Sequence, residues 1–113
     1  MGKIYPVKSN NPIGELDNEG RVYTHFGFTR SAIGKVETDG KVYSGTGWSP
    51  KMVGSVDPDG KVYVPEGFGK KQIGDIDTDG KVFAGTGGSR TEVGRVEPPH
   101  MMFSGGALLL LIR

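Results

Sequence analysis

Hydrophobic and polar residues follow a pattern along this chain that repeats every twenty residues without insertion or deletion. In each copy an aliphatic residue precedes a glycine, a second aliphatic follows two positions later, and a valine and an aromatic residue come after a polar turn. Copies run over residues 13–23, 33–43, 53–63 and 73–83, and a partial copy begins at Val93. A fixed period of this kind predicts a repeat architecture with one supersecondary unit per copy.

The polar centre of each copy predicts a tight β-hairpin turn. In the third copy it reads Asp57-Pro58-Asp59-Gly60, where proline presets φ for a type I turn and glycine accepts a positive φ. This is the pattern of a three-residue hairpin loop with a glycine bulge. Short β-branched and aromatic runs flank each turn, so the copies are predicted to be β-hairpins rather than helices.

The turn register predicts which side chains share a face of the hairpin. In the third copy Val56 lies across from Val62, while Ser55 and Tyr63 point to the opposite face. The valine face is therefore the predicted core. This face narrows toward Gly54, where a glycine within a strand indicates that two backbones approach closely.

The predicted fold class is all-β, with about five tandem hairpins packed on one another, because a lone two-stranded hairpin is marginally stable. The 113 residues include 20 glycines and 7 prolines, and 35% are hydrophobic, which agrees with short strands in one domain. The expected organisation is a half unit at 1–12, repeats at 13–32, 33–52, 53–72 and 73–92, and a partial repeat with an apolar closing strand at 93–113.

The two ends of the chain carry complementary halves of a repeat. Residues 1–5 match the second strand of a unit, whereas residues 93–97 match a first strand whose Asp-Gly turn is replaced by Pro98-Pro99-His100. Pairing these halves would close the hairpins around an axis and remove exposed strand edges. The alternative is an open stack, in which each hairpin buries its face only on its neighbours.

The tail from Gly105 to Arg113 is the most apolar segment of the chain. It is too short for a transmembrane helix, which needs roughly twenty apolar residues. A continuous apolar run after two glycines predicts a strand buried on both faces, which would lock the assembly from inside or along its seam. If it were exposed, this strand would offer a contact for oligomerisation.

Composition narrows the classes of function. Fourteen basic and thirteen acidic residues are interleaved, with a net charge of +1, so no nucleic-acid-binding face is expected. The chain has no cysteine, which excludes disulfides and thiolate metal sites. No apolar segment follows the first residues, so no signal peptide is predicted and a cytoplasmic location is expected.

The sequence offers little catalytic or metal-binding chemistry. Asp-x-Asp-Gly is half of an EF-hand loop, but the fifth position is Arg21, Lys41, Lys61 or Lys81, a cation where a ligand is needed. His25 and His100 stand far apart in unrelated contexts, and no serine lies in a nucleophile motif. We therefore expect no metal, no cofactor and no catalytic residue, and nothing in the sequence indicates an enzyme.

Recurrent aromatic residues are the candidate binding residues. The linkers between hairpins carry Phe28, Trp48 and Phe68, and the second strands carry Tyr23, Tyr43 and Tyr63. The linker rings either cover hydrophobic gaps between hairpins or form subsites for a carbohydrate or another small molecule. Repeated exposed loops on a scaffold without catalytic chemistry favour a non-catalytic interaction module that binds a protein partner.

The whole chain resembles small, uncharacterised bacterial proteins built from Gly-x-Val-Asp-x-Asp-Gly-x-Val-Tyr hairpins, as at residues 54–63, with a leucine-rich C-terminal strand, as at 108–111. That resemblance implies a fold but does not indicate any activity. In period and outline the units also resemble choline-binding and related cell-wall-binding repeats, which bind ligands in aromatic pockets between hairpins; this likeness implies a ligand contact at Trp48. Residues 42–47 are similar to part of the hairpin-forming MORN repeats.

Overall fold

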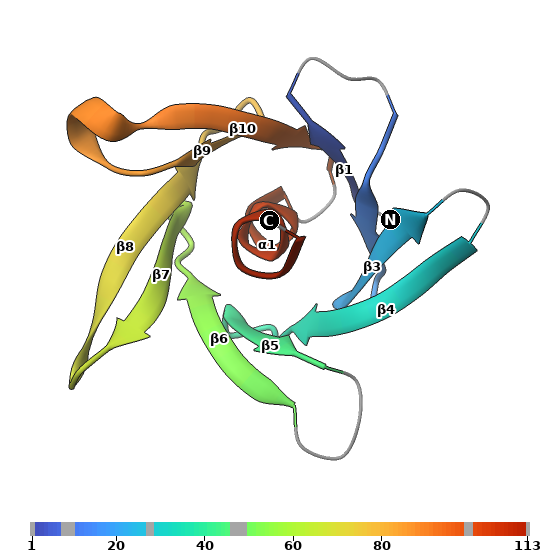
Figure 1. The fold of residues 1–113 in the computed structure, drawn as a ribbon, viewed down its shortest axis with the longest axis horizontal. Helices are drawn as coiled ribbons and strands as arrows, with labels where there is room; N and C mark the ends of the chain where they lie inside the picture. Colours follow the sequence, from blue (N-terminus) through green and yellow to red (C-terminus); the bar gives the residue numbers. More distant parts are fainter. Residues whose placement is uncertain (1, 8–10, 27–28, 46–49, 99–100, 113) are drawn as a thin grey trace.

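In the computed structural model, which describes residues 2–7, 11–26, 29–45, 50–98 and 101–112, a closed antiparallel barrel surrounds one short central helix (Figure 1). The described part of the chain contains ten strands. They are β1 (Gly2–Pro6), β2 (Gly14–Leu16), β3 (Arg21–Phe26), β4 (Thr29–Val36), β5 (Lys41–Ser44), β6 (Lys51–Val56), β7 (Lys61–Glu66), β8 (Gly69–Ile76), β9 (Lys81–Ala84) and β10 (Thr91–Val96). A 3-10 turn, η1, spans Gly87–Ser89, the helix α1 spans Met101–Ala107, and a π-helical turn, η2, spans Leu108–Ile112.

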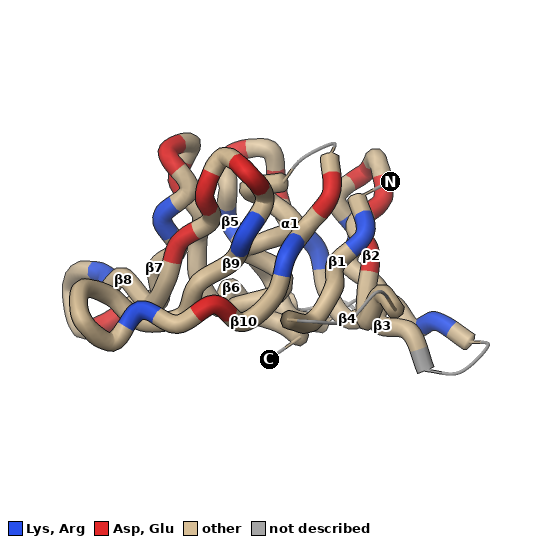
Figure 2. Tube along the Cα trace, turned by 90° about the horizontal axis from the view of Figure 1, so that it is seen from above, with Lys and Arg blue, Asp and Glu red and all other residues tan. Residues whose placement is uncertain are grey.

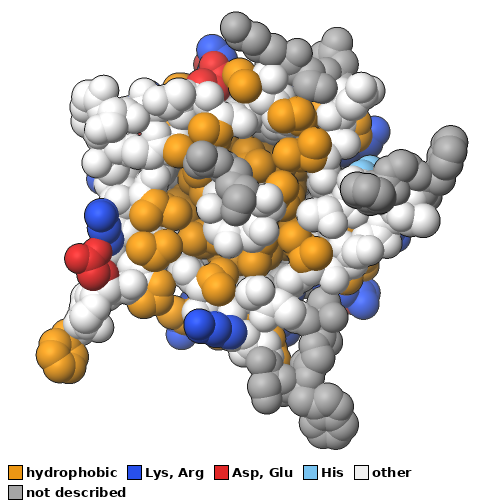
Figure 3. Space-filling model, viewed as in Figure 1, with side chains coloured by type: hydrophobic (Ala, Val, Ile, Leu, Met, Phe, Trp, Pro, Cys, Tyr) orange, Lys and Arg blue, Asp and Glu red, His pale blue; other side chains and the backbone are white. Residues whose placement is uncertain are grey.

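The barrel is shallow, with extents of 38 × 36 × 20 Å. Figure 2 shows the Asp-Gly hairpin turns gathered along one rim, which we call the turn rim. The connections between successive hairpins splay outward at the opposite end (Figure 2). Seen down the barrel axis, hydrophobic side chains gather around the middle of the molecule (Figure 3).

Strand β1 closes the ring, because it pairs with β10 on one side and with β2 on the other. Ile4 lies across from Val96 in one ladder and from Gly14 in the other. The Tyr5 hydroxyl also donates a hydrogen bond of 2.9 Å to Glu97 Oε1, and this bond raises the pKa of Tyr5. The predicted closure by two half repeats is confirmed, and the open stack is wrong.

The hairpin turns have the predicted geometry. In the third repeat the Gly60 N–H donates to the Asp57 carbonyl at 2.9 Å, the Asp57 N–H donates to the Lys61 carbonyl at 2.8 Å, and φ of Gly60 is 93°. The Gly60 carbonyl in turn accepts the Ile76 N–H at 2.8 Å, which joins this turn to the next hairpin. A Cβ at Gly60 would collide with the Ile76 carbonyl oxygen, so glycine is required for both its conformation and its small size.

The valine face lines the barrel interior, as predicted. Val56 lies across from Val62, and Ser55 lies across from Tyr63 on the outer face. Two rings of buried aliphatic residues form the core: Leu16, Val36, Val56, Ile76 and Val96, and then Ile4, Val22, Val42, Val62 and Val82. Beyond them Gly54 and its equivalents lie so close to the neighbouring strand that a Cβ would collide with a backbone carbonyl, which confirms the predicted close approach.

The apolar tail runs through the barrel as a helix, so the predicted closing strand is wrong. Each strand of the ring already has two partners, and a further strand inside would leave its backbone N–H and C=O groups unpaired. A helix satisfies these groups internally and can be buried without a ladder. The oligomer contact that was predicted for this segment assumed a strand; Leu108 and Leu109 are instead buried inside the barrel.

The π-helical turn η2 has five residues, one for each of the five glycines that surround it. A Cβ built on each innermost glycine would lie 2.7–3.0 Å from a terminal methyl of a different residue of η2. The pairs are Leu108 with Gly94, Leu109 with Gly74, Leu110 with Gly54, Leu111 with Gly34, and Ile112 with Gly14. Five repeats lie about 72° apart around the axis, whereas an α-helix advances about 100° per residue. The wider π turn, with its i→i+5 hydrogen bonds, brings one side chain to each repeat.

Candidate functional site

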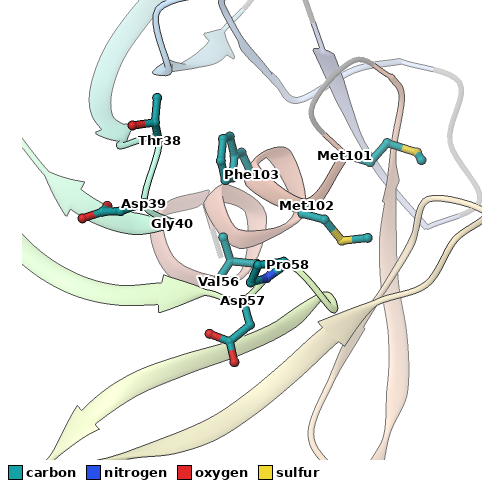
Figure 4. Close-up of a pocket in the computed structure, with 9 residues that line it drawn as sticks. All are labelled: Thr38, Asp39, Gly40, Val56, Asp57, Pro58, Met101, Met102 and Phe103. Atoms are coloured by element: carbon teal, nitrogen blue, oxygen red, sulfur yellow. The ribbon is translucent and has the colours of Figure 1, made fainter.

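An apolar depression lies at the turn rim, where the central helix begins (Figure 4). Its larger cavity, of about 380 Å³, is lined by Thr38, Asp39, Gly40, Val56, Asp57, Pro58, Met101, Met102 and Phe103. A second cavity, of about 190 Å³, is lined by Leu16, Asp17, Asn18, Glu19, Gly20, Val36, Thr38 and Phe103. Because the two cavities share Thr38 and Phe103, we treat them as one site, the turn-rim groove.

The first residues of α1 build the wall of this groove. A Cβ placed on Gly60 would lie 3.1 Å from Met102 Sδ, and one on Gly80 would lie 3.2 Å from Met101 Sδ. In Figure 4 the Phe103 ring lies between the helix and the turn that carries Thr38. All three side chains are only half-buried, although they belong to the core helix. Methionine is flexible and polarizable, so this wall can adapt to the shape of a bound group.

Charge at the turn rim is predominantly negative. Each of the four complete turns, residues 17–21, 37–41, 57–61 and 77–81, carries two acids and one base, so each contributes −1 and together they contribute −4. Figure 2 shows these acidic residues at the tips of the hairpins. The nearly neutral net charge of the chain therefore conceals an acidic rim around the apolar groove.

Asp17, at the edge of the groove, is held by four hydrogen bonds. Its Oδ1 accepts the Glu19 and Arg21 N–H groups at 2.9 Å each, and its Oδ2 accepts Arg21 Nε at 3.2 Å and the Tyr23 hydroxyl at 3.3 Å. Partial burial works to raise the pKa of Asp17, but the Arg21 and Glu19 N–H groups, the Tyr23 hydroxyl and the Arg21 guanidinium together lower it below its usual value.

We expect Asp17→Asn to reduce the free energy of unfolding by about 1 kcal/mol at neutral pH and to weaken its dependence on pH. The folded-state pKa of Asp17 is lowered, so its ionised form stabilises the fold above the unfolded pKa of about 3.9. This contribution is lost as the pH falls through the folded-state pKa. Urea unfolding measured in steps from neutral to strongly acidic pH tests the prediction, and an unchanged acid slope in the variant would contradict it.

The outer face of the barrel carries the tyrosines that were predicted as binding residues. Tyr23, Tyr43 and Tyr63 are half-buried at equivalent places around the ring, so they do not converge on one site. Arg30 lies over the Tyr23 ring, with Cζ 4.4 Å from its centroid, and Lys70 lies over the Tyr63 ring, with Nζ at 4.2 Å. Among the described side chains, a cation therefore covers the ring at two of these three tyrosine positions.

Of the predicted linker aromatics, only Phe68 lies within the described residues; Phe28 and Trp48 lie outside them. Phe68 is at the tip of the β7–β8 hairpin and is fully exposed, so the interpretation that it covers a hydrophobic gap is wrong. A cavity of about 420 Å³ lies beside it on the outer face.

The histidines are the remaining candidates for catalytic or metal-binding chemistry. His25 Nε2 lies 3.6 Å from Glu15 Oε1, and Arg30 is also paired with Glu15, while His100 lies outside the described residues. No group of three or more histidine, cysteine or acidic side chains within the described ranges could hold a metal ion. Among the described helices, none combines the length and the apolar character that crossing a membrane requires.

The chain gives no significant match to a protein-family model, a curated protein or a solved structure. Its function is therefore inferred from the geometry of the groove and of the outer face. The sequence predicted the hairpin turns of the turn rim, but it did not predict that residues 101–103 form the wall of the groove. The available signal was a run of three large flexible or aromatic residues directly before the small residues Ser104, Gly105 and Gly106.

Proposed function

We propose that this protein is a non-catalytic interaction module whose turn-rim groove binds a segment of a partner protein. The observation that carries the proposal is an apolar groove, walled by Met101, Met102 and Phe103, in the middle of a rim with a net negative charge. A half-buried apolar wall of this kind on a closed barrel favours contact with another molecule.

The groove indicates the chemistry of the partner. Its larger cavity of about 380 Å³ accommodates one large apolar side chain as an anchor. Lysine or arginine residues beside that anchor would face Asp39 and Asp57 at the groove edge. Such exposed charge pairs accelerate encounter and select the partner, whereas the buried anchor supplies most of the affinity.

The rim is also organised before a partner arrives. The Val36 N–H donates to the Gly20 carbonyl at 2.7 Å, and the Val56 N–H donates to the Gly40 carbonyl at 2.8 Å, so each turn is joined to the next strand. Turns that are already ordered lose little conformational entropy on binding.

The proposal is tested with a displayed library of random peptides, selected on the wild-type protein and on two variants. Thr38→Arg places a long cation in the wall that both cavities share. Thr78→Arg makes the same change at the equivalent turn position of another repeat, which lines neither cavity. Both threonines are exposed, so both variants should fold.

We expect the selected peptides to share an aromatic or long aliphatic residue flanked by lysine or arginine. Their affinity should fall at least about tenfold in Thr38→Arg, where charge repulsion and steric block act together, and stay nearly constant in Thr78→Arg. In NMR spectra of protein with ¹³C-labelled methionine methyls, the methyl signals of Met101 and Met102 should shift on binding. Equal loss of affinity in both variants, or no enrichment of such peptides, would refute a site in this groove.

A second candidate function is a small-molecule-binding module that uses the aromatic residues of the outer face. The specific observation that favours it is the cavity of about 420 Å³ beside Phe68, which residues of β6, β7 and β8 line. Nothing in this candidate depends on the turn-rim groove.

A further inference from the structure

An arrangement of three side chains recurs on the outer face, where a hairpin meets the strand that follows it. In the fourth repeat Asp75 lies directly across the ladder from Phe83. Arg90 covers the Phe83 ring, with Cζ 3.6 Å from the centroid. Its Nε and Nη2 donate to the two carboxylate oxygens of Asp75 at 2.8 Å each. The acid, the ring and the cation therefore form a closed unit in which the cation is fully paired.

The first repeat has the same arrangement with different residue types. Glu15 lies across from Tyr23, Arg30 covers the Tyr23 ring, and Arg30 is paired with Glu15. The acid, ring and cation of this repeat precede those of the fourth by sixty residues in each case, which is three periods of the sequence. The repeat therefore fixes the three positions of this arrangement, and the first and fourth repeats fill all three.

The third repeat keeps the ring and the cation but lacks the acid. Ser55 occupies the place of the acid across from Tyr63, and Lys70 covers the Tyr63 ring. The ion pair of Lys70 is with Asp57 Oδ1, at 3.8 Å, between side chains that are 54% and 36% exposed. An exposed pair at that separation holds the ammonium weakly. A hydroxyl and a loosely held cation therefore stand where the other two repeats have a complete ion pair.

A cavity lies at this same junction. It is lined by Met52, Gly54, Ser55, Val64, Pro65, Phe68, Gly69 and Lys70, and its volume is about 420 Å³. Met52 is 40% exposed and Phe68 is fully exposed, and these are two of the three exposed large hydrophobic residues in the described part of the chain. Exposed apolar side chains that gather around a cavity indicate a binding surface.

We propose that this junction binds a small monocarboxylic acid with an aromatic or branched apolar body. The ligand carboxylate takes the place that Asp75 has in the fourth repeat, where it meets the Lys70 ammonium and accepts a hydrogen bond from the Ser55 hydroxyl. The apolar body lies against Met52, Val64 and Phe68. The proposal deepens the small-molecule candidate and is independent of the turn-rim groove.

The residue types of the cavity select this ligand class. One ammonium balances one carboxylate, whereas a phosphate dianion would retain an unpaired charge. The apolar lining leaves the hydroxyl groups of a sugar without partners, which makes their desolvation costly. The second repeat provides an internal comparison, because Pro50 replaces the cation and Lys35 is paired with Glu37 at 3.2 Å. Within the described ranges, that junction therefore has no counterpart of the loosely held Lys70 over Tyr43.

The probes are phenylacetate and its neutral amide, phenylacetamide, titrated into protein with ¹³C-labelled methionine methyls. Met52 lines the junction cavity, and Met101 and Met102 line the turn-rim groove, so one spectrum distinguishes the two sites. We expect phenylacetate to shift the NMR signal of the Met52 methyl saturably, while the methyl signals of Met101 and Met102 stay unchanged. Phenylacetamide should bind at least about tenfold more weakly, because it cannot pair with the ammonium.

Two variants remove the proposed anion site in different ways. Ser55→Asp completes the arrangement of the fourth repeat, so its carboxylate should pair with Lys70 and exclude the ligand. Lys70→Met removes the cation and keeps much of the apolar stem. Each should weaken phenylacetate binding at least about tenfold. Lys71→Met is the matched control, since it removes one positive charge from the neighbouring residue, which does not line the cavity, and it should bind as the wild type does.

Several outcomes would overturn the site. They are equal binding of acid and amide, unchanged binding in Ser55→Asp, and equal losses in Lys70→Met and Lys71→Met. Shifts of the Met101 and Met102 methyl signals without a shift of the Met52 signal would also overturn it. That result would place the ligand in the turn-rim groove and leave the proposal for the groove standing. Conversely, saturable Met52 shifts that Ser55→Asp and Lys70→Met abolish would support the junction site even if the peptide selection fails.

Discussion

A chain that ends at residue 100 is expected to be unfolded in water. Removing residues 101–113 takes the central helix out of the barrel, and the two rings of inward aliphatic side chains then enclose an empty space. Burial of one leucine or isoleucine contributes about 1.5–3 kcal/mol. The loss of Leu108 and Leu109, together with the partly buried Leu110, Leu111 and Ile112, therefore approaches the whole stability of a small domain, about 5–15 kcal/mol.

Circular dichroism and the dispersion of backbone amide signals in NMR spectra measure this outcome. Two point variants provide a graded comparison within the same segment. Leu108→Ala removes a fully buried side chain and should cost about 2–5 kcal/mol, whereas Leu111→Ala, at a partly exposed position, should cost less. A truncated chain that still melts cooperatively would show that the hairpins can fold without the helix, and this account of the core would be wrong.

Gly105→Ala is expected to destabilise the protein by about 3 kcal/mol, because the barrel has no room for one more methyl group at this level. A Cβ at Gly105 would overlap Ile76 Cγ1 and would lie 2.6 Å from Ile76 Cδ1. Ile76 is itself buried in a strand that pairs on both sides, so it cannot move away without disturbing its neighbours. Denaturant unfolding measures the loss.

A double mutant separates this collision from a general effect of alanine in the helix. Ile76→Ala alone leaves a cavity and should cost about 2–5 kcal/mol. Combined with Gly105→Ala it should cost less than the sum of the two, since the new methyl group occupies the vacated space. Gly88→Ala is the control, because a Cβ there meets nothing within 4 Å. Strictly additive losses would argue against direct contact between the two positions.

The turns and the inward face could be predicted because they depend on neighbouring residues. Asp57-Pro58-Asp59-Gly60 specifies a glycine-bulge loop by its dihedral preferences alone. Once that loop is placed, the period of two along a strand decides that Val56 and Val62 face inward. The half repeats at the two ends then made closure the simplest way to remove both free edges.

The binding sites could be predicted only in part. The sequence shows that residues 55 and 70 differ in type from their counterparts 75 and 90. That these two residues share one cavity follows from the ladder between β6 and β7 and from the path of the β7–β8 hairpin. Similarly, Met102 and Phe103 reach the turns only because the helix enters the barrel from the turn rim.

By itself the sequence determined the strands, the turns and the core-facing side chains, because local dihedral preferences and a strict period suffice for each. The sequence also allowed an open stack, and the pairing of β1 with β10 decided for the closed ring. The tail was different, since a short apolar run such as residues 108–112 is compatible with a strand or a helix. Only the tertiary structure decided between them. The ring leaves no free edge to pair with, so a buried segment must satisfy its own backbone hydrogen bonds, and a helix does so.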